Sequence, residues 1–232
     1  MDTKDIKDFK MGIELEKLNI FTIMKDNIKT KNFVELFKRE ISSNFIKQKP
    51  WREENELIPI DKKEFQKIFK EESSTLYLEY DNIVFLMFMA SEDNLLKWFA
   101  ISLKRSPDIE RKLILEKIKG LIFKIKYITN PLYIRTAHDD GSGDPIEQEK
   151  LNQKIFSLHW MQIFSKEMLH SINVDKLKNS DKFYEVQDLP DGSIFIQITE
   201  DFGYTDPLIK ELSDEIEIDC PEIYRWWDPQ EI

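Results

Sequence analysis

The sequence predicts an α+β fold, with an antiparallel-rich mixed sheet or sheets and helices packed mainly on one side. Three observations lead to this prediction. Two pairs of β-like segments, within residues 75–90 and 183–199, are each joined by a tight turn signal. A long amphipathic segment that opens at Ser106-Pro107-Asp108 stands between strand-like segments. Tight turns give antiparallel pairing, and hairpins mixed with helices are typical of α+β domains.

The chain begins with a predicted strand and two predicted helices. Residues Leu18–Met24 are β-branched and aromatic, which is typical of a strand. Thr30 is expected to cap a helix whose apolar positions continue at helical spacing as far as Phe45. A capping box that begins at Asp61 predicts a short helix over residues 61–69.

Three strands and the long helix come next. Residues 75–80 and 83–90 flank Asp81-Asn82, a plausible two-residue hairpin turn because both residues tolerate positive φ. The unbroken apolar run over 83–90 predicts a central strand that is buried on both faces. A third strand is predicted over 97–103, and the long helix is expected to end at Asn130-Pro131.

The C-terminal elements are predicted from shorter signals. Residues 132–137 are typical of a strand, and residues 147–172 are expected to be helical, in two pieces. Leu189-Pro-Asp-Gly192 is a strong turn signal that predicts a hairpin over 183–199. A final helix is predicted over 207–217, with Asp206-Pro207 at its start.

The most loop-like stretch is His138 to Pro145, rich in Asp, Gly and Ser. It divides the chain into an N-terminal half, residues 1–137, and a C-terminal half, residues 146–232. Domains usually contain about 100–200 residues, so a chain of 232 is expected to form one compact domain with the two halves joined at 138–145.

Negative charge is concentrated at the C-terminal end. The formal net charge is −10, yet residues 185–232 contain fourteen acidic and two basic side chains, a net charge of −12, so residues 1–184 carry +2. Five further acids, with no Lys or Arg, lie within 139–149. Such surfaces repel nucleic acid and speed the encounter with a basic protein. The alternative is a solvated face that only keeps the protein soluble.

Residues 104–126 are basic, with eight Lys or Arg against three acids. A basic helix can bind nucleic acid. These side chains alternate with an apolar stripe, however, as in any amphipathic helix with a solvated outer face. We therefore expect no nucleic-acid partner.

Neither export nor membrane insertion is expected. The first ten residues are charged throughout and contain no signal-peptide apolar run. The longest apolar stretch, Ile83–Ala90, has eight residues, whereas about 20 are needed to cross a bilayer. The one cysteine, Cys220, excludes an internal disulfide framework. The sequence thus predicts a cytoplasmic protein with a reduced thiol.

One triplet, His138-Asp139-Asp140, has the residue types of a metal site, because imidazole and carboxylates together bind divalent ions. Metal phosphohydrolases need further His and Asp ligands at defined distances, so a turn-forming Asp pair is the favoured interpretation. Cys220 lies among acids, which raise the pKa of a thiol. No catalytic residue, metal or cofactor is predicted.

Two C-terminal motifs carry a family resemblance. They are Leu158-His-Trp160-Met-Gln-Ile-Phe164-Ser-Lys-Glu-Met-Leu169 and Asp188-Leu-Pro-Asp-Gly192-Ser-Ile-Phe-Ile-Gln-Ile-Thr199-Glu-Asp-Phe202, followed by Asp206-Pro207 and a helix. In this order they resemble the immunity protein 52 family, bacterial antidotes from polymorphic-toxin and interbacterial-competition loci, including type VI secretion. A related family of secretion-system immunity proteins has a similar Trp helix and Gly-Gly strand, and the motifs do not separate the two.

The chain departs from the family pattern at several positions. His159 replaces a Gly before the Trp, Ser193 replaces a second Gly, and Asp206 replaces an Asn. The Arg-Lys-Glu-Ser-like element is missing at Met24–Thr30. The remaining shared residues, Trp160, Gly192, Thr199 and Phe202, are interpreted as positions that make the fold.

The resemblance implies a non-enzymatic immunity protein that binds and neutralises a cognate toxin or effector by non-covalent capture. The toxin is expected to present a basic surface. The alternative is a metal-dependent hydrolase that uses His138, Asp139 and Asp140. The acidic segments and nearby aromatic residues are the predicted partner-binding residues, namely Asp139, Asp140, Asp144, Glu147, Glu200, Asp201, Tyr204, Tyr224, Trp226 and Trp227.

Overall fold

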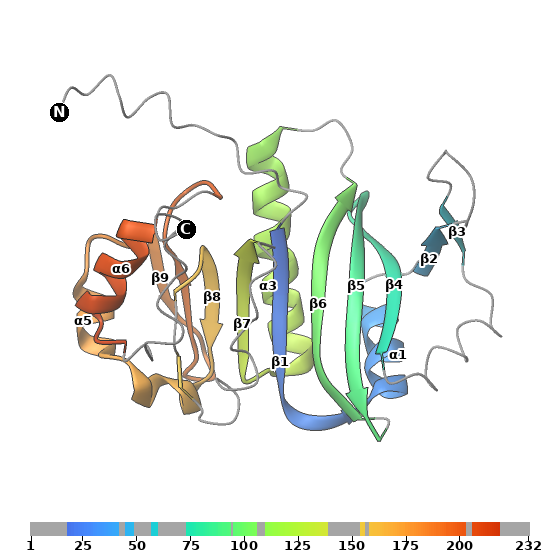
Figure 1. Cartoon of the computed structure of the whole chain (residues 1–232), viewed down its shortest axis with the longest axis horizontal. Coiled ribbons are helices and arrows are strands. Elements are labelled where there is room, and N and C mark those ends of the chain that lie inside the picture. The colour runs from blue at the N-terminus through green and yellow to red at the C-terminus, as the bar shows by residue number, and fades with distance from the viewer. Residues whose placement is uncertain are drawn as a thin grey trace, which may run out of the picture.

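The computed structural model describes residues 18–41, 45–48, 57–59, 73–93, 95–105, 110–138, 154–155, 158–202 and 206–218. These residues form one ten-stranded sheet in the order β3-β2-β4-β5-β6-β1-β7-β8-β10-β9, in which every pair is antiparallel (Figure 1). The strands are β1 Leu18–Lys29, β2 Phe45–Gln48, β3 Leu57–Pro59, β4 Ser73–Tyr80, β5 Ile83–Glu92, β6 Leu95–Arg105, β7 Tyr133–His138, β8 Met161–Phe164, β9 Glu185–Asp188 and β10 Ile194–Gln197. The predicted α+β class is confirmed.

The two longest helices cover one face of this sheet. They are α1, Thr30–Glu40, and α3, Arg111–Thr129, and both lie behind the sheet in Figure 1. Shorter helices pack with the C-terminal strands, namely the 3₁₀ helix η2 Lys166–Ser171, α5 Val174–Asn179 and α6 Asp206–Glu215. In the part of the chain described above, no helix is long and apolar enough to span a membrane.

Both predicted hairpin turns are confirmed. Asp81 and Asn82 join β4 to β5 with φ of 52° and 64°, the left-handed values that a type I′ turn requires. Gly192 lies in the turn between β9 and β10 with φ of 82°, a conformation that strains any residue with a Cβ. Turn chemistry therefore sets the register of both hairpins.

Strand β5 is central, as predicted, but it is not buried on both faces. Its side chains alternate: Met87 and Met89 are buried against the helices, whereas Leu86 is half-buried and Phe88 is 37% exposed. The ring of Phe88 lies 5.5 Å from that of Trp98 on the same open face. Apolar residues on the outer face, and not burial, make this strand an unbroken hydrophobic run.

Helix α1 differs from its prediction at both ends. Thr30 is its first helical residue and is itself buried; Lys29 occupies the N-cap position without a side-chain hydrogen bond. The helix ends at Glu40, and Phe45 belongs to β2. Packing explains where α1 lies along the chain. Phe33 and Phe37 meet Phe99 of β6 in one aromatic cluster, with ring centroids 4.8 Å and 6.0 Å from that of Phe99.

The predicted helix over 147–172 is wrong where the structure describes it. Residues Met161–Phe164 form β8, and only Lys166–Ser171 are helical, as a 3₁₀ helix. All four residues of β8 are buried because the strand lies between β7 and β10 with side chains packed on both faces. A short run that is buried throughout and apolar at all but one residue has no periodicity that separates strand from helix.

The C-terminal strands separate two hydrophobic cores. Ile163 of β8 and its partner Phe195 of β10 face the core beneath α3, whereas Phe164 and its partner Ile194 face the opposite core. That second core also contains Leu212 of α6. Pairing of β7 with β8 continues the sheet from the first half of the chain into the second. The predicted joining loop, 138–145, lies outside the described residues except for His138, which ends β7.

Candidate functional site

Three residues of the C-terminal motifs, Trp160, Thr199 and Phe202, meet at one point of the fold. The indole of Trp160 is fully buried, and its Nε1 donates a hydrogen bond of 2.9 Å to the Thr199 carbonyl. Its ring meets that of Phe202 edge-on, with centroids 5.3 Å apart. The structure therefore agrees with the interpretation of these three residues as fold-making positions.

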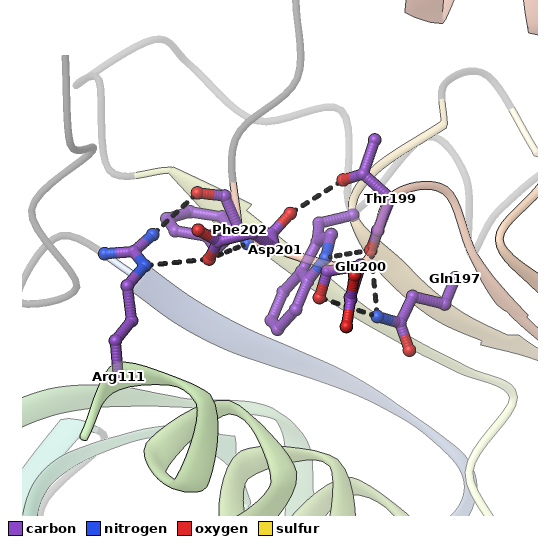
Figure 2. Close-up of polar contacts among 7 residues, drawn as sticks. Arg111, Gln197, Thr199, Glu200, Asp201 and Phe202 are labelled. Carbon is purple, nitrogen blue, oxygen red and sulfur yellow. Dashed lines mark hydrogen bonds and ion pairs between the residues drawn. The ribbon is translucent and has the colours of Figure 1, made fainter. Parts of the chain in front are cut away.

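Around this anchor, residues 197–202 form a dense hydrogen-bonded turn, called the 197–202 turn below (Figure 2). The side-chain amide of Gln197 donates to the carbonyls of Thr199, at 2.8 Å, and Glu200, at 3.2 Å. The Thr199 hydroxyl donates to the Asp201 carbonyl at 2.7 Å, and the Phe202 amide donates to Asp201 Oδ1 at 2.7 Å. Local bonds of this kind fix a turn without regular secondary structure.

The 197–202 turn is also bound to the start of α3. Arg111 donates from Nε to Asp201 Oδ1 at 2.7 Å and from Nη2 to the Phe202 carbonyl at 2.8 Å (Figure 2). Lys112 lies 3.4 Å from Glu200. Helix α3 has no acid in its first turn and no side-chain cap. Asp201 and Glu200 therefore supply, from another segment, the negative charge that a helix N-terminus favours.

Further along α3, two lysines reach the β9–β10 hairpin. Lys119 pairs with Glu185, and Lys126 Nζ lies 2.5 Å from Asp191 and 3.2 Å from Asn130 Oδ1. The Lys126 side chain is only 3% exposed, so its charge depends on these partners. The basic side of α3 and part of the acidic C-terminal segment thus neutralise each other inside the molecule.

Asp191 holds the hairpin turn to α3. Although burial opposes ionisation, the hydrogen bonds from Lys126 and from the Ser193 hydroxyl and amide lower the pKa of Asp191 to about 2. Because this pKa is below its ordinary value of 3.8, the ionised carboxylate stabilises the fold above pH 3.8. That contribution is lost as the pH falls through the interval from 3.8 to about 2.

We expect Asp191→Ala to lower the free energy of unfolding by about 1–2 kcal/mol at pH 7, after allowance for solvent screening, because it leaves the buried Lys126 ammonium with one neutral acceptor. Urea unfolding measures this change. Asp188→Ala is the matched control, since its 2.7 Å pair with Lys178 is at the surface and is expected to contribute less than about 0.5 kcal/mol. Equal losses in both variants would contradict the assigned role of Asp191.

Beside the 197–202 turn lies a surface hollow of about 540 Å³, called the α3 hollow below. Its helix side is formed by Arg111, Lys112, Leu115, Glu116 and Lys119. Its sheet side is formed by Met161, Tyr184, Glu185, Gln197, Glu200 and Asp201. The hollow thus lies where α3 crosses the C-terminal strands.

The α3 hollow combines a small apolar base with a charged rim. Leu115 and Met161 are buried apolar side chains at its base, and Tyr184 is 54% exposed at its rim. Charged side chains of both signs surround this apolar base. Exposed tyrosines next to apolar pockets with a polar rim are typical of binding hot spots. The arrangement is suited to holding a side chain of another molecule.

The histidines occupy contrasting environments. His159 is buried, and its Nε2 lies 3.0 Å from Arg135 Nη1, so it accepts a hydrogen bond from the guanidinium. Burial first, and then the Arg135 charge, lower the pKa of His159 well below its ordinary value of 6.5. His159 is therefore neutral at pH 7. His170 is exposed on η2, with Nδ1 lying 2.7 Å from the Glu167 carbonyl.

Of the predicted partner-binding residues, Glu200 and Asp201 lie in the 197–202 turn. Their side chains remain largely exposed although both are paired with α3. The other predicted residues lie outside the described part of the chain, namely Asp139, Asp140, Asp144, Glu147, Tyr204, Tyr224, Trp226 and Trp227. Among the residues that are described, no three His, Cys, Asp or Glu side chains group as metal ligands. Asp139, Asp140 and Cys220 lie outside that set.

Sequence reasoning missed two cations on the helix side of the site and a tyrosine on its sheet side. Arg111, Lys112 and Tyr184 were not among the predicted residues, because each looks like an ordinary solvated side chain when read alone. The signal that could have found the two cations was the opposite charge of residues 104–126 and 185–232. Segments of opposite charge are candidates for contact.

Comparison with known proteins adds little to these observations. Neither protein-family models nor curated protein sequences match the chain. Among solved structures, a type VI secretion system protein of Pseudomonas aeruginosa is similar, with a TM-score of 0.47 and 11% identity over 93% of this chain and 83% of that one. A likeness this weak establishes neither fold nor function. The function is therefore inferred from the residues themselves.

Proposed function

We propose that this chain is an immunity protein of the kind that protects a bacterium from its own toxin. It would bind a cognate toxin or effector by non-covalent capture and would perform no chemistry. Two features support the proposal. One is the resemblance of residues 158–217 to the immunity protein 52 family. The other is the surface that these same residues form.

The observation that carries the proposal is the hydrogen-bonded 197–202 turn beside the α3 hollow. Trp160 and Phe202 anchor the turn from below, and hydrogen bonds from Gln197 and Thr199 fix its backbone. Buried motif residues therefore hold exposed carboxylates next to a pocket. A surface fixed before binding loses little conformational entropy when a partner docks, which favours tight capture.

Electrostatics suit a basic toxin. Four acids of the acidic C-terminal segment are paired with α3, namely Glu185, Asp191, Glu200 and Asp201. Asp214 of the same segment and Asp181, which precedes it, are exposed, and no described residue pairs with them. The whole chain keeps a net charge of −10. A negative field of this kind accelerates the approach of a positively charged partner and weakens with added salt.

The test is co-expression of this chain with the product of the gene immediately upstream. We expect the upstream product to arrest growth when expressed alone and to be tolerated when this chain is present. The two proteins should then co-elute as a stable complex in gel filtration at physiological salt. The control is co-expression of the upstream product with an unrelated acidic protein, which should give neither protection nor a complex.

Two results would contradict the proposal. One is an upstream product that arrests growth equally with and without this chain. The other is protection without a complex, which would point to an enzymatic or indirect mode of rescue.

A further inference from the structure

We propose that the α3 hollow receives an arginine side chain of the toxin. This inference rests on the proposed function and specifies what part of the partner enters the site. It follows from three features of the hollow: its charge balance, its apolar base and its exposed aromatic rim.

The charge balance leaves one acid in excess. The hollow is lined by four acids and three basic residues. Each base is paired with an acid across the hollow: Arg111 with Asp201, Lys112 with Glu200, and Lys119 with Glu185. Glu116 is the fourth acid, and no described residue lies within ion-pair distance of it. An occupant with one positive charge complements this arrangement.

The position of Glu116 favours a cation although it lies near the N-terminus of α3, where the helix dipole is positive. A helix N-terminus repels positive charge, but this effect is confined to the first turn. Glu116 is the sixth residue of α3, in its second turn, and the acids of the 197–202 turn already occupy the first. The field at Glu116 is therefore set by its own carboxylate and by its paired neighbours.

The base and rim of the hollow favour arginine over lysine. Leu115 and Met161 offer apolar contact to the methylene groups of a long side chain, which can bury its stem while its charged end stays hydrated. Tyr184 offers an exposed ring on which a planar guanidinium can stack. Glu116 can accept two parallel hydrogen bonds from a guanidinium, whereas an ammonium provides only a point charge.

The first experiment probes the hollow without the toxin. We would titrate N-acetyl-argininamide into the isotopically labelled protein and follow the backbone and methyl NMR signals. The expected dissociation constant is about 1 mM, from a ligand efficiency of about 0.3 kcal/mol per non-hydrogen atom. Shifts should be concentrated at Leu115, Glu116, Met161 and Tyr184. N-acetyl-citrullinamide, a neutral isostere, should cause no saturable shifts there.

Variants assign the binding to the residues named. Glu116→Gln should lower the affinity of the protein for the arginine probe roughly tenfold, the loss expected when a charged hydrogen-bonding partner is removed. Asp214→Asn, a change at an exposed acid of α6 outside the hollow, should leave its affinity unchanged. Equal shifts from the arginine and citrulline probes, or equal effects of the two variants, would overturn the assignment of the hollow.

A second arm uses the complex with the upstream gene product. Glu116→Gln should weaken that complex roughly tenfold, and one Arg→Ala change on the toxin should do the same with no further loss when both are combined. If the wild-type complex forms and Glu116→Gln leaves its dissociation constant unchanged, this inference is overturned and the proposed function stays intact. Absence of any wild-type complex would overturn the proposed function and with it the toxin as source of the arginine, while the probe still reports on the hollow.

Discussion

Replacing Trp160 with alanine is expected to lower the free energy of unfolding by about 3–5 kcal/mol, the range for large aromatic truncations in a core. The side chain is fully buried, packs on Phe202 and bonds the Thr199 carbonyl. A loss of this size is a large part of the roughly 5–15 kcal/mol that typically stabilises a domain. Urea unfolding followed by circular dichroism measures it.

Because Trp160→Ala can prevent folding altogether, Trp160→Phe gives the quantitative test. It keeps an aromatic ring but removes the indole N–H and part of the volume. The Thr199 carbonyl keeps its bond from Gln197, so we expect a loss of about 1–2 kcal/mol. Trp98→Phe, on the open sheet face, is the control and should lose less than about 1 kcal/mol. If Trp160→Phe and Trp98→Phe lose equal free energy of unfolding, Trp160 does not anchor the 197–202 turn.

The second large effect is expected on mild acidification. His159 stays neutral when folded, because burial and Arg135 lower its pKa, but titrates near its ordinary value of 6.5 when unfolded. As the pH falls below 6.5 the unfolded chain therefore takes up a proton that the folded chain does not. The free energy of unfolding should fall as the pH is lowered from 6.5 to 5, with a slope that approaches the one-proton limit of about 1.4 kcal/mol per pH unit. Well above pH 6.5 the residue contributes no slope.

The interval from pH 6.5 to 5 isolates histidine from the carboxylates. Interactions with Lys25, Lys182 and Lys176 lower the pKa values of Glu167, Glu215 and Glu217 below 4.5, so these acids act only at lower pH. His159→Gln, which can still accept from Arg135, should abolish most of the slope. His170→Gln, at an exposed site, should retain it. A slope that survives His159→Gln would show that another group titrates.

Local signals predicted the parts of the fold that local chemistry determines. The turns at Asp81-Asn82 and at Gly192 were predicted because their backbone conformations demand particular residues. Helix α3 was predicted because its apolar stripe repeats at helical spacing and Asn130-Pro131 is a stop signal, and the structure ends the helix at Asn130 in the left-handed conformation. In these elements propensity, pattern and packing agree.

The wrong predictions of secondary structure fall where tertiary contacts determine which element forms. Strand β8 is apolar on every residue but one and buried throughout, so only its place between β7 and β10 makes it a strand. Phe45 continued a helical pattern, yet pairing with Leu78 of β4 places it in β2. The site shows the same limit, because Arg111 and Asp201 are 90 residues apart and meet only in the folded chain.

Two exposed tyrosines distinguish whether the α3 hollow and the 197–202 turn form the proposed toxin-binding surface. Tyr184 is 54% exposed at the hollow, and Tyr127 is 66% exposed on α3 outside it. The measurement is the dissociation constant of the complex with the upstream gene product. Tyr184→Ala should raise it about 10- to 30-fold, as for a hot-spot residue, and Tyr127→Ala by less than about twofold. Equal effects of the two changes would show that the toxin does not bind at the α3 hollow.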